Sequence, residues 1–331
     1  MDWDRKSIRI GAAVIGCAVG LRLLCGGLGN WLLRTVTSPQ LTSVMLFFET
    51  GHVIKTPTVT AGDSPADTEP SVGSGSPAQQ TPAEPGVPVF SVADAHLVEV
   101  NNICGYETDV AADLTQALTW DLTAEAPAVL ILHSHGTEGY REQAEGGYRS
   151  ENTEENMIAI GDRLVQVLEA GGVRAVHDRQ LHDSPSYSAA YGNARESIEY
   201  YLEQYPTIRL VLDIHRDAVE SSDGTQTGFV TQVDGESTAQ LMLVVGTDAS
   251  GLSHPYWPEN MSLAVKLQAL LEKRQSGICR PISFRSQRFN QDLSTGALLL
   301  EMGAAGNSRQ EALLATEFLA DAIIELAKGT G

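Results

Sequence analysis

The sequence predicts an α/β domain with a mostly parallel sheet flanked by helices, preceded by a transmembrane helix and a disordered linker. From about residue 90 onward, short apolar runs that read as strands alternate with helical patterns. This alternation is typical of a largely parallel sheet. The chain has 331 residues, of which 42% are hydrophobic, so it is long enough to bury a large core.

The first 34 residues are predicted to form a cytoplasmic tip and a membrane anchor. Residues 8–33 are apolar apart from Arg9 at their start, Arg22 and Asn30, and about 20 apolar residues span a bilayer. A long arginine side chain can reach toward the headgroups, which lowers the cost of its charge. A cleaved signal peptide is the alternative, but no Ala-x-Ala site follows the apolar run. Basic residues are more numerous before the segment than after it, which places the N-terminus in the cytoplasm and the rest outside.

Three segments are expected after the anchor. Residues 35–53 form a juxtamembrane segment with a short apolar patch. Residues 54–88 are dense in Pro, Ser, Thr, Gly and Ala and almost lack large apolar side chains. Such a composition cannot bury enough surface to offset the entropy of ordering, so we expect a disordered linker there. Residues 89–331 are expected to form one folded domain, and the residues discussed below give it the chemistry of a zinc hydrolase.

The strands and helices of this domain follow from runs and periodicity. Six apolar runs are expected to form strands, and they lie at residues 128–133, 173–176, 208–214, 228–233, 240–245 and 297–301. Four helices are expected at residues 156–168, 186–205, 261–272 and 309–327. In parallel α/β sheets, functional sites form at the carboxyl ends of the strands. Polar residues at those ends are therefore the candidates for chemistry.

Three residues at or just beyond strand ends have the side chains of a catalytic zinc site. His135 and Glu138 follow the strand at 128–133, and His215 follows the strand at 208–214. Two imidazoles and a carboxylate, with one position left for water, are a common catalytic zinc ligand set. Of the two nearby histidines, His135 is the expected ligand because it lies beyond the strand, in the turn with Gly136, and His133 is expected to be a core or supporting residue. Asp213 should share a face with His215 and orient it.

The carboxylate ligand has an alternative in the acidic stretch before the helix at 156. Glu151 or Glu155 could replace Glu138 there, although acidic residues at that place also stabilise a helix N-terminus. Glu301 follows an apolar run. A charge in such a place is costly unless it takes part in the chemistry or is paired with an opposite charge. We expect it to act as the catalytic general base and acid.

Arginines in the same part of the chain are candidates for substrate binding. Arg216, Arg285 and Arg288 could bind a substrate carboxylate or polarise a carbonyl. No serine nucleophile elbow and no phosphate-binding glycine loop occurs in the sequence. The net charge of −20 makes nucleic acid an unfavourable partner. No Cys-x-x-Cys pair is present, which disfavours a thiolate zinc site, and unpaired Cys104 and Cys279 are favoured over a disulfide between them.

Five motifs resemble those of the stage II sporulation protein P family, over roughly residues 95–328. They are His133-Ser-His135-Gly-Thr-Glu138-Gly-Tyr140, Leu212-Asp213-Ile-His215-Arg216-Asp217-Ala218, Gly246-Thr-Asp248, Arg288-Phe-Asn290-Gln-Asp-Leu-Ser294 and Glu301-Met-Gly-Ala-Ala-Gly-Asn307. The resemblance implies a fold like that of zinc N-acetylmuramoyl-L-alanine amidases and zinc carboxypeptidases. It adds Asn290 to the candidate substrate-binding residues. It leaves the second ligand open, because related amidases take their carboxylate from a helix, here the 151–155 region.

The resemblance also implies an activity and partners. Members of the family cleave stem peptides from glycan strands and cut peptide cross-links, with Zn²⁺ as cofactor. They act in engulfment of the forespore, with stage II sporulation proteins D and M as partners. The expected function is therefore a membrane-anchored peptidoglycan hydrolase whose catalytic domain lies outside the cell membrane. Two alternatives stay open: a non-catalytic peptidoglycan-binding scaffold that recruits a lytic partner, and a zinc carboxypeptidase.

Overall fold

The structure, a computed structural model, describes residues 90–118 and 121–329. A seven-stranded sheet forms the centre of this part of the chain. The strand order is β1-β8-β7-β9-β4-β2-β3. The strands are β1 (Val100–Asn102), β2 (Val129–Leu132), β3 (Ala175–His177), β4 (Leu210–Asp217), β7 (Leu241–Val245), β8 (Ile282–Phe284) and β9 (Ala297–Ala304). All neighbouring pairs are parallel except β7 and β9, which are antiparallel. The expected mostly parallel α/β sheet is confirmed.

The antiparallel pair divides the sheet into two parallel blocks. Strands β9, β4, β2 and β3 run in one direction, and β1, β8 and β7 run in the other. The carboxyl ends of the two blocks therefore lie at opposite edges of the sheet. A hairpin of β5 (Val230–Val233) and β6 (Glu236–Ala239) forms a separate two-stranded sheet. The apolar run predicted at 228–233 thus pairs in this hairpin and not in the main sheet.

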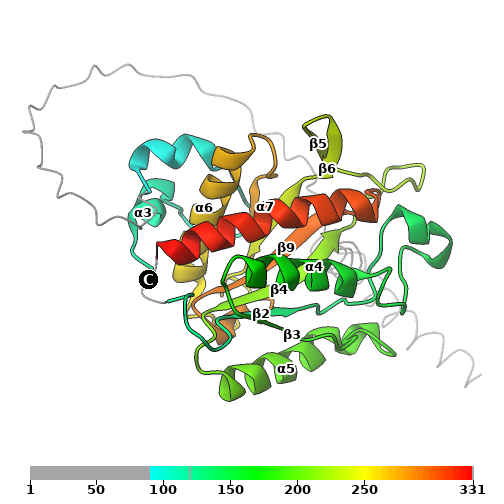
Figure 1. Ribbon diagram of the computed structural model, residues 1–331, viewed down its shortest axis with the longest axis horizontal. Helices are drawn as coiled ribbons and strands as arrows, with labels where there is room; N and C mark the ends of the chain where they lie inside the picture. The colour runs from blue at the N-terminus through cyan, green and yellow to red at the C-terminus, as the bar shows by residue number, and fades with distance from the viewer. Residues whose placement is uncertain (1–89, 119–120, 330–331) are drawn as a thin grey trace, which may run out of the picture. The chain divides into compact units, whose positions relative to one another are not determined.

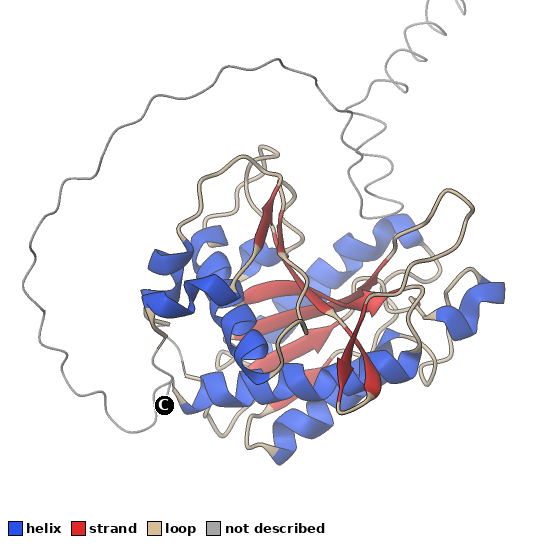
Figure 2. Ribbon diagram, turned by 90° about the horizontal axis from the view of Figure 1, so that it is seen from above, coloured by secondary structure: helices blue, strands red, loops and turns tan. Residues whose placement is uncertain are grey.

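Helices cover both faces of the main sheet (Figures 1 and 2). The α-helices are α3 (Val110–Thr115), α4 (Met157–Ala170), α5 (Ala190–Gln204), α6 (Trp257–Arg274) and α7 (Arg309–Lys328), and the short 3-10 helices are η1 (Val92–Leu97), η2 (Arg141–Gly146), η3 (Tyr187–Ala189) and η4 (Gln291–Leu293). Helices α4, α6 and α7 pack on one face in the larger apolar cluster, and α5 packs on the other. All four predicted helices are present, with ends that differ by a few residues.

Local sequence explains where two of the helices begin and where one of them ends. The Asn156 side chain caps α4 by accepting a hydrogen bond from the backbone N–H of Ile158. Ser308 and Glu311 form a capping box at the start of α7. Gly172, at φ 89°, follows the end of α4 in the left-handed conformation that glycine adopts without strain.

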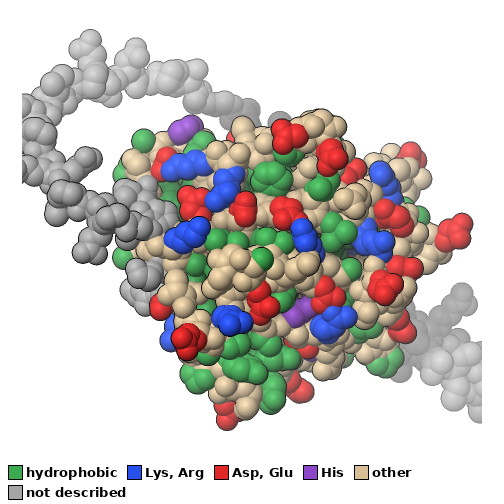
Figure 3. Space-filling model, viewed as in Figure 1, with side chains coloured by type: hydrophobic (Ala, Val, Ile, Leu, Met, Phe, Trp, Pro, Cys, Tyr) green, Lys and Arg blue, Asp and Glu red, His purple; other side chains and the backbone are tan. Residues whose placement is uncertain are grey.

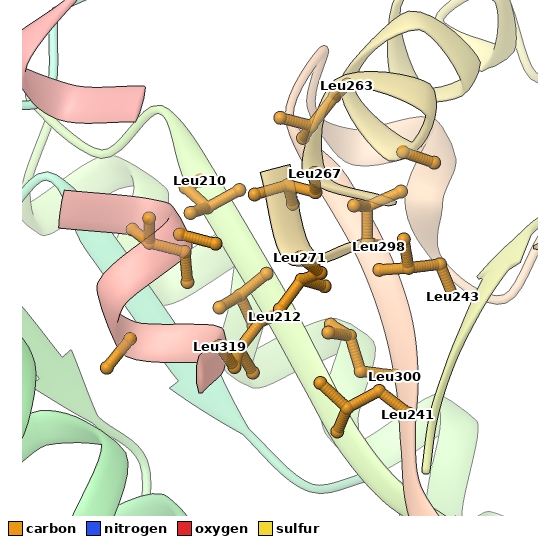
Figure 4. Close-up of a cluster of buried hydrophobic side chains, with 14 of the residues drawn as sticks. Leu210, Leu212, Leu241, Leu243, Leu263, Leu267, Leu271, Leu298, Leu300 and Leu319 are labelled. Carbon is orange, nitrogen blue, oxygen red and sulfur yellow. The ribbon is translucent and has the colours of Figure 1, made fainter. Parts of the chain in front are cut away.

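Leucines of alternate strand positions build the core under α6 and α7 (Figure 4). Leu210 and Leu212 of β4 and Leu298 and Leu300 of β9 face these helices and are at most 1% exposed. Their neighbours in sequence face α5, because side chains alternate across a strand. Val211 and Ala297 pack in the apolar cluster that includes α5. His215 and Glu301 lie an even number of residues further along the same two strands, so they point to the same face.

His133 lies on the opposite face of the sheet from that site, as expected of a core residue. Alternation does not explain this, because residues two apart on a strand share a face; β2 ends at Leu132, and His135 lies in the turn beyond it. Its Nδ1 lies 2.8 Å from the carbonyl oxygen of Ile214, and its Nε2 lies 2.9 Å from Nε2 of His177. Burial and the neighbouring imidazole lower the pKa of His133 to about 3. Helix α4 crosses this histidine pair at Gly161, where a Cβ atom would lie 2.5 Å and 2.6 Å from the two Nε2 atoms. His133 is a core residue that ties β2 to β4.

Gly161→Ala is expected to lower the free energy of unfolding by about 1–3 kcal/mol, because the added methyl group must displace the histidine pair or the helix. Alanine in a helix otherwise gains up to about 1 kcal/mol over glycine. Gly192→Ala in α5 is the matched control, because nothing lies within 4 Å of its Cβ position. Urea denaturation of both variants measures the difference, and equal effects would contradict the packing argument.

Several sequence predictions fall outside the described residues. The predicted anchor, juxtamembrane segment and linker lie in residues 1–88, which the structure does not describe. Of the helices in residues 90–118 and 121–329, none is long and apolar enough to cross a membrane.

Cys104 and Cys279 are both free thiols, as favoured. Acidic and basic side chains are interspersed over the face that carries α4 and α7, with no continuous basic surface in that view (Figure 3).

Candidate active site

Three adjacent strands bring the predicted site residues to one edge of the sheet. His215 of β4 and Glu301 of β9 are direct register partners. His135 comes just after β2, the neighbour of β4 on its other side. The rings of His135 and His215 meet edge to face, with centroids 5.4 Å apart. The convergence of these three side chains follows from the strand order β9-β4-β2.

His215 lies between two carboxylates. Its Nε2 is 2.9 Å from Oδ1 of Asp213, and its Nδ1 is 3.5 Å from Oε2 of Glu138. Burial would lower the pKa of His215, but the two carboxylates outweigh it and raise the pKa well above its ordinary value. Asp213 orients the ring by holding one nitrogen, as predicted, so the other nitrogen faces Glu138.

Glu138 is held ionised in a buried place. Its side chain is 8% exposed and lies 3.6 Å from Nη1 of Arg216 and 3.8 Å from Nη2 of Arg149. Burial alone would raise the pKa of Glu138, but Arg216, His215 and His135 lower it well below its usual range. A buried carboxylate that stays charged beside two imidazoles is suited to bind a cation.

Two buried aspartates fix the loop that carries His135. Ser134 donates to Asp213 from its backbone N–H at 2.7 Å and from its hydroxyl at 2.5 Å. Thr137 donates in the same two ways to Asp183, at 3.1 Å and 2.6 Å. The loop is therefore tied on both sides of His135, once to β4 and once to the loop that follows β3.

The His135 ring is held by contacts that the sequence patterns did not predict. Oδ2 of Asp183 lies 3.8 Å from its Nδ1. The Tyr187 ring stacks on it with centroids 4.3 Å apart, and the Arg149 guanidinium lies over the ring of that tyrosine, 4.5 Å from its centroid. Asp183 and Tyr187 come from a loop and from η3, where no apolar run or motif marks them. A histidine next to an aspartate, His182-Asp183, is the weak sequence signal that could have pointed to this loop.

Glu301 has the properties of a group that transfers protons. Burial and the nearby Asp217 raise the pKa of Glu301 to about 8. Its Oε2 is shielded from solvent and makes no hydrogen bond to any described residue. A carboxyl group whose pKa lies near neutrality and which has an uncommitted oxygen can both accept and release a proton.

The alternative carboxylate ligands have other contacts. Glu151 is exposed and accepts a hydrogen bond from the Ser184 hydroxyl at 2.6 Å. Glu155 accepts one from the Ser150 hydroxyl at 3.0 Å. Glu138 is the only one of these three glutamates that has an ion-pair contact with a site histidine among the described residues.

The predicted substrate-binding residues differ in their surroundings. Arg216 is buried, and besides Glu138 its guanidinium donates to the carbonyl oxygens of Gly139 and Tyr148. Arg288 pairs with Asp292 at 3.2 Å. Asn290 donates to the carbonyl oxygen of Tyr191 at 2.8 Å, so its loop reaches the site although it follows β8. Their roles toward substrate stay predictions.

Comparison with known proteins identifies the family. A sequence profile described as Stage II sporulation protein P (SpoIIP) matches residues 65–324. The chain belongs to this family. Stage II sporulation protein P of Bacillus subtilis (strain 168) is 28% identical to it over 218 residues. That alignment covers 62% of this chain and 52% of the relative, so the chain matches about half the relative's length.

Solved structures that resemble this SpoIIP-family chain include two amidases. The N-acetylmuramoyl-L-alanine amidase AmiC2 of Nostoc punctiforme has 18% identity and a TM-score of 0.37, with 61% of this chain and 93% of that chain covered. The CwlD amidase from Clostridioides difficile, solved in complex with the GerS lipoprotein, has 14% identity and a TM-score of 0.37, with 60% and 94% covered.

The residues of this SpoIIP-family site fit zinc in their chemistry and in one spacing. Among residues 90–118 and 121–329, no group of three or more His, Cys, Asp and Glu side chains is arranged to hold a metal as it stands. Two ligands of one tetrahedral zinc ion lie about 3.3 Å apart at ordinary bond lengths. The 3.5 Å between His215 Nδ1 and Glu138 Oε2 is close to that. Nδ1 of His135 is buried and makes no hydrogen bond to a described residue, and its ring lies edge to face with that of His215.

Asp183→Asn is expected to weaken zinc binding about 10- to 100-fold, because Asp183 anchors the His135 loop through Thr137 and its carboxylate lies 3.8 Å from the His135 ring. Competition with a chromophoric chelator measures the affinity. Asp178→Asn is the matched control, since Asp178 lies in the same loop but pairs with His182, at 2.9 Å. Equal zinc affinities in the two variants would show that Asp183 does not support zinc binding.

Proposed function

We propose that this SpoIIP-family protein is a zinc-dependent peptidoglycan hydrolase of the N-acetylmuramoyl-L-alanine amidase type. The observation that carries the proposal is the convergence of His135, Glu138, His215 and Glu301 at one sheet edge. Both histidines have a buried aspartate beside a ring nitrogen. Membership of the SpoIIP family supports a role in sporulation and a cell-wall substrate.

His135, Glu138 and His215 would hold the metal in this proposal. When bound, Zn²⁺ supplies a Lewis acid and makes water a nucleophile at neutral pH. Asp213 and Asp183 hold the imidazole rings in place, so little reorganisation is needed when the ion binds. Arg216 keeps Glu138 ionised.

Glu301 moves the proton during the reaction. It accepts a proton from the attacking water as the oxygen adds to the amide carbonyl carbon. It then gives that proton to the amide nitrogen as the carbon–nitrogen bond breaks. The pKa near 8 suits both halves of this transfer. The products are a free lactyl carboxylate on the glycan and a stem peptide with a free amino group.

The proposal includes a location and partners. An N-terminal anchor in residues 1–34 and a linker would hold the catalytic domain outside the membrane and within reach of the wall. Cleavage of peptide cross-links is a second activity of the same site, and the sporulation proteins D and M are its proposed partners. These elements rest on the sequence patterns and on the family resemblance.

Digestion of purified sacculi by the full chain in detergent, with zinc or with a chelator, tests this function. Mass analysis of the soluble products distinguishes the reactions. Free stem peptides that appear only with zinc support the amidase. Loss of cross-links alone indicates an endopeptidase, and loss of only terminal residues indicates a carboxypeptidase. Binding without release of any fragment, even with the partner proteins, would favour a scaffold and contradict the enzyme.

A further inference from the structure

Tyr191 lies over the candidate site at the start of α5, in the second position of that helix. Its ring lies edge to face with His135, at 5.5 Å between centroids, and nearly parallel to His215, at 6.5 Å. It is the one tyrosine among the described residues with ring contacts to both histidines. No sequence motif marked it.

A strained loop holds Tyr191 in this place. Phe289 and Asn290 both have left-handed backbone conformations, with φ of 50° and 57°. Such conformations cost free energy in residues other than glycine and are often found at functional sites. The Phe289 ring lies 6.1 Å from the ring of Tyr191, and Asn290 donates to the Tyr191 carbonyl oxygen at 2.8 Å. Both strained residues thus contact the tyrosine.

The hydroxyl of Tyr191 is available as a donor. It makes no hydrogen bond to any described residue, whereas the hydroxyl of Tyr140, also near the site, donates to the carbonyl oxygen of Met302. Burial, together with the carboxylates of Asp213, Glu301 and Glu138, raises the pKa of Tyr191 well above its ordinary value.

The arginines closest to the proposed ligands are committed elsewhere. Arg216 donates to Gly139 and Tyr148 and pairs with Glu138. Arg149 pairs with Asp183 at 3.0 Å. Hydrolysis of an amide puts negative charge on the carbonyl oxygen, and a donor aimed at that oxygen stabilises the transition state. Among the groups around His135 and His215, the Tyr191 hydroxyl can supply it without breaking an existing bond.

We propose that Tyr191 is a further catalytic residue, whose hydroxyl donates a hydrogen bond to the scissile carbonyl oxygen as that oxygen becomes an oxyanion. This inference rests on the proposed amide hydrolysis. The water oxygen adds to the carbonyl carbon, the carbonyl π electrons move to the oxygen, and Glu301 takes the proton of the water. The proton of Tyr191 stays on its own oxygen throughout, so the residue is unchanged at the end of the cycle.

Tyr191→Phe in the full chain tests the role, because it removes the hydroxyl and keeps the ring. The expected result on sacculi is a fall in kcat of about 10²-fold with KM changed less than about threefold. Zinc content and melting temperature should equal those of the wild type. A tetrahedral phosphonamidate analogue of the muramyl-alanine amide should also lose about 10²-fold in affinity, whereas the intact amide should bind as before.

Tyr200→Phe is the matched control, because Tyr200 lies on the same helix and is 56% exposed. Its kcat should equal that of the wild type. An active Tyr191→Phe variant with wild-type kcat and wild-type affinity for the analogue would overturn the role of Tyr191 and leave the proposed function intact. A wild-type chain that releases no fragment with zinc would instead contradict the proposed function itself.

Discussion

Replacing Glu301 with glutamine is expected to lower kcat for amide hydrolysis by about 10³-fold while the protein still binds zinc. Glutamine keeps the shape of the side chain but can neither accept the proton of the attacking water nor pass it to the leaving amine. Product release from sacculi measures the rate, and elemental analysis of the purified variant measures the zinc. A variant that keeps wild-type kcat would show that another group moves the proton.

The same variant should change how the stability of the metal-free protein depends on pH. Burial and Asp217 raise the pKa of Glu301 from 4.5 to about 8. Between these two values the unfolded chain has lost a proton that the folded protein keeps, so this group makes the wild type less stable as pH rises from 4.5 to 8. Glu301→Gln should lack that contribution. Thermal unfolding across this window, with a chelator present, measures the difference between the two proteins.

Replacing Glu138 is expected to remove zinc and activity together. Glu138→Ala takes away a ligand carboxylate, so zinc should be lost at concentrations that saturate the wild type, and kcat should fall with it. The buried Arg216 would also lose its partner, which destabilises the fold. Glu138→Gln serves as a second variant, because its amide oxygen keeps a polar neighbour for that arginine. Both variants should be zinc-deficient.

Glu151→Ala and Glu155→Ala are the controls for the ligand assignment. Their carboxylates accept hydrogen bonds from Ser184 and Ser150 and have no described contact with His135 or His215. Both variants should keep zinc and activity. Zinc retained in Glu138→Gln and lost in either control would transfer the ligand role to the acidic stretch before α4.

The sequence predicts the part of the site that the strands carry. Strand β4 is buried at all eight positions, although it contains Asp213, His215, Arg216 and Asp217. Polar residues in an otherwise apolar run are visible in a sequence because burying them is costly. Alternation along the strand then gave the side that each one faces. For the same reasons Glu301 could be predicted. The separation of His133 from His135 could not, because alternation would place both on one face and only the end of β2 at Leu132 sets them apart.

The rest of the site depends on where loops go, which periodicity does not show. Asp183, Tyr187 and Tyr191 follow β3 and reach His135 only because β3 lies beside β2. The reversal of β7 against β9 was equally hidden, since an apolar run does not show the direction of its strand. It places Gly246 and Asp248 at the edge opposite to His215. The three-residue strands β1 and β8 were too short for a periodic signal.

The double attachment of the His135 loop has a consequence for metal selectivity. Because Ser134 and Thr137 are each held by a buried aspartate, His135 cannot swing away from His215 to suit an incoming ion. The fold, rather than the ion, sets the span between the two imidazoles. Proteins discriminate among divalent metals largely through imposed geometry, since intrinsic affinities favour copper. Discrimination here would then originate in two aspartates that do not bind the metal.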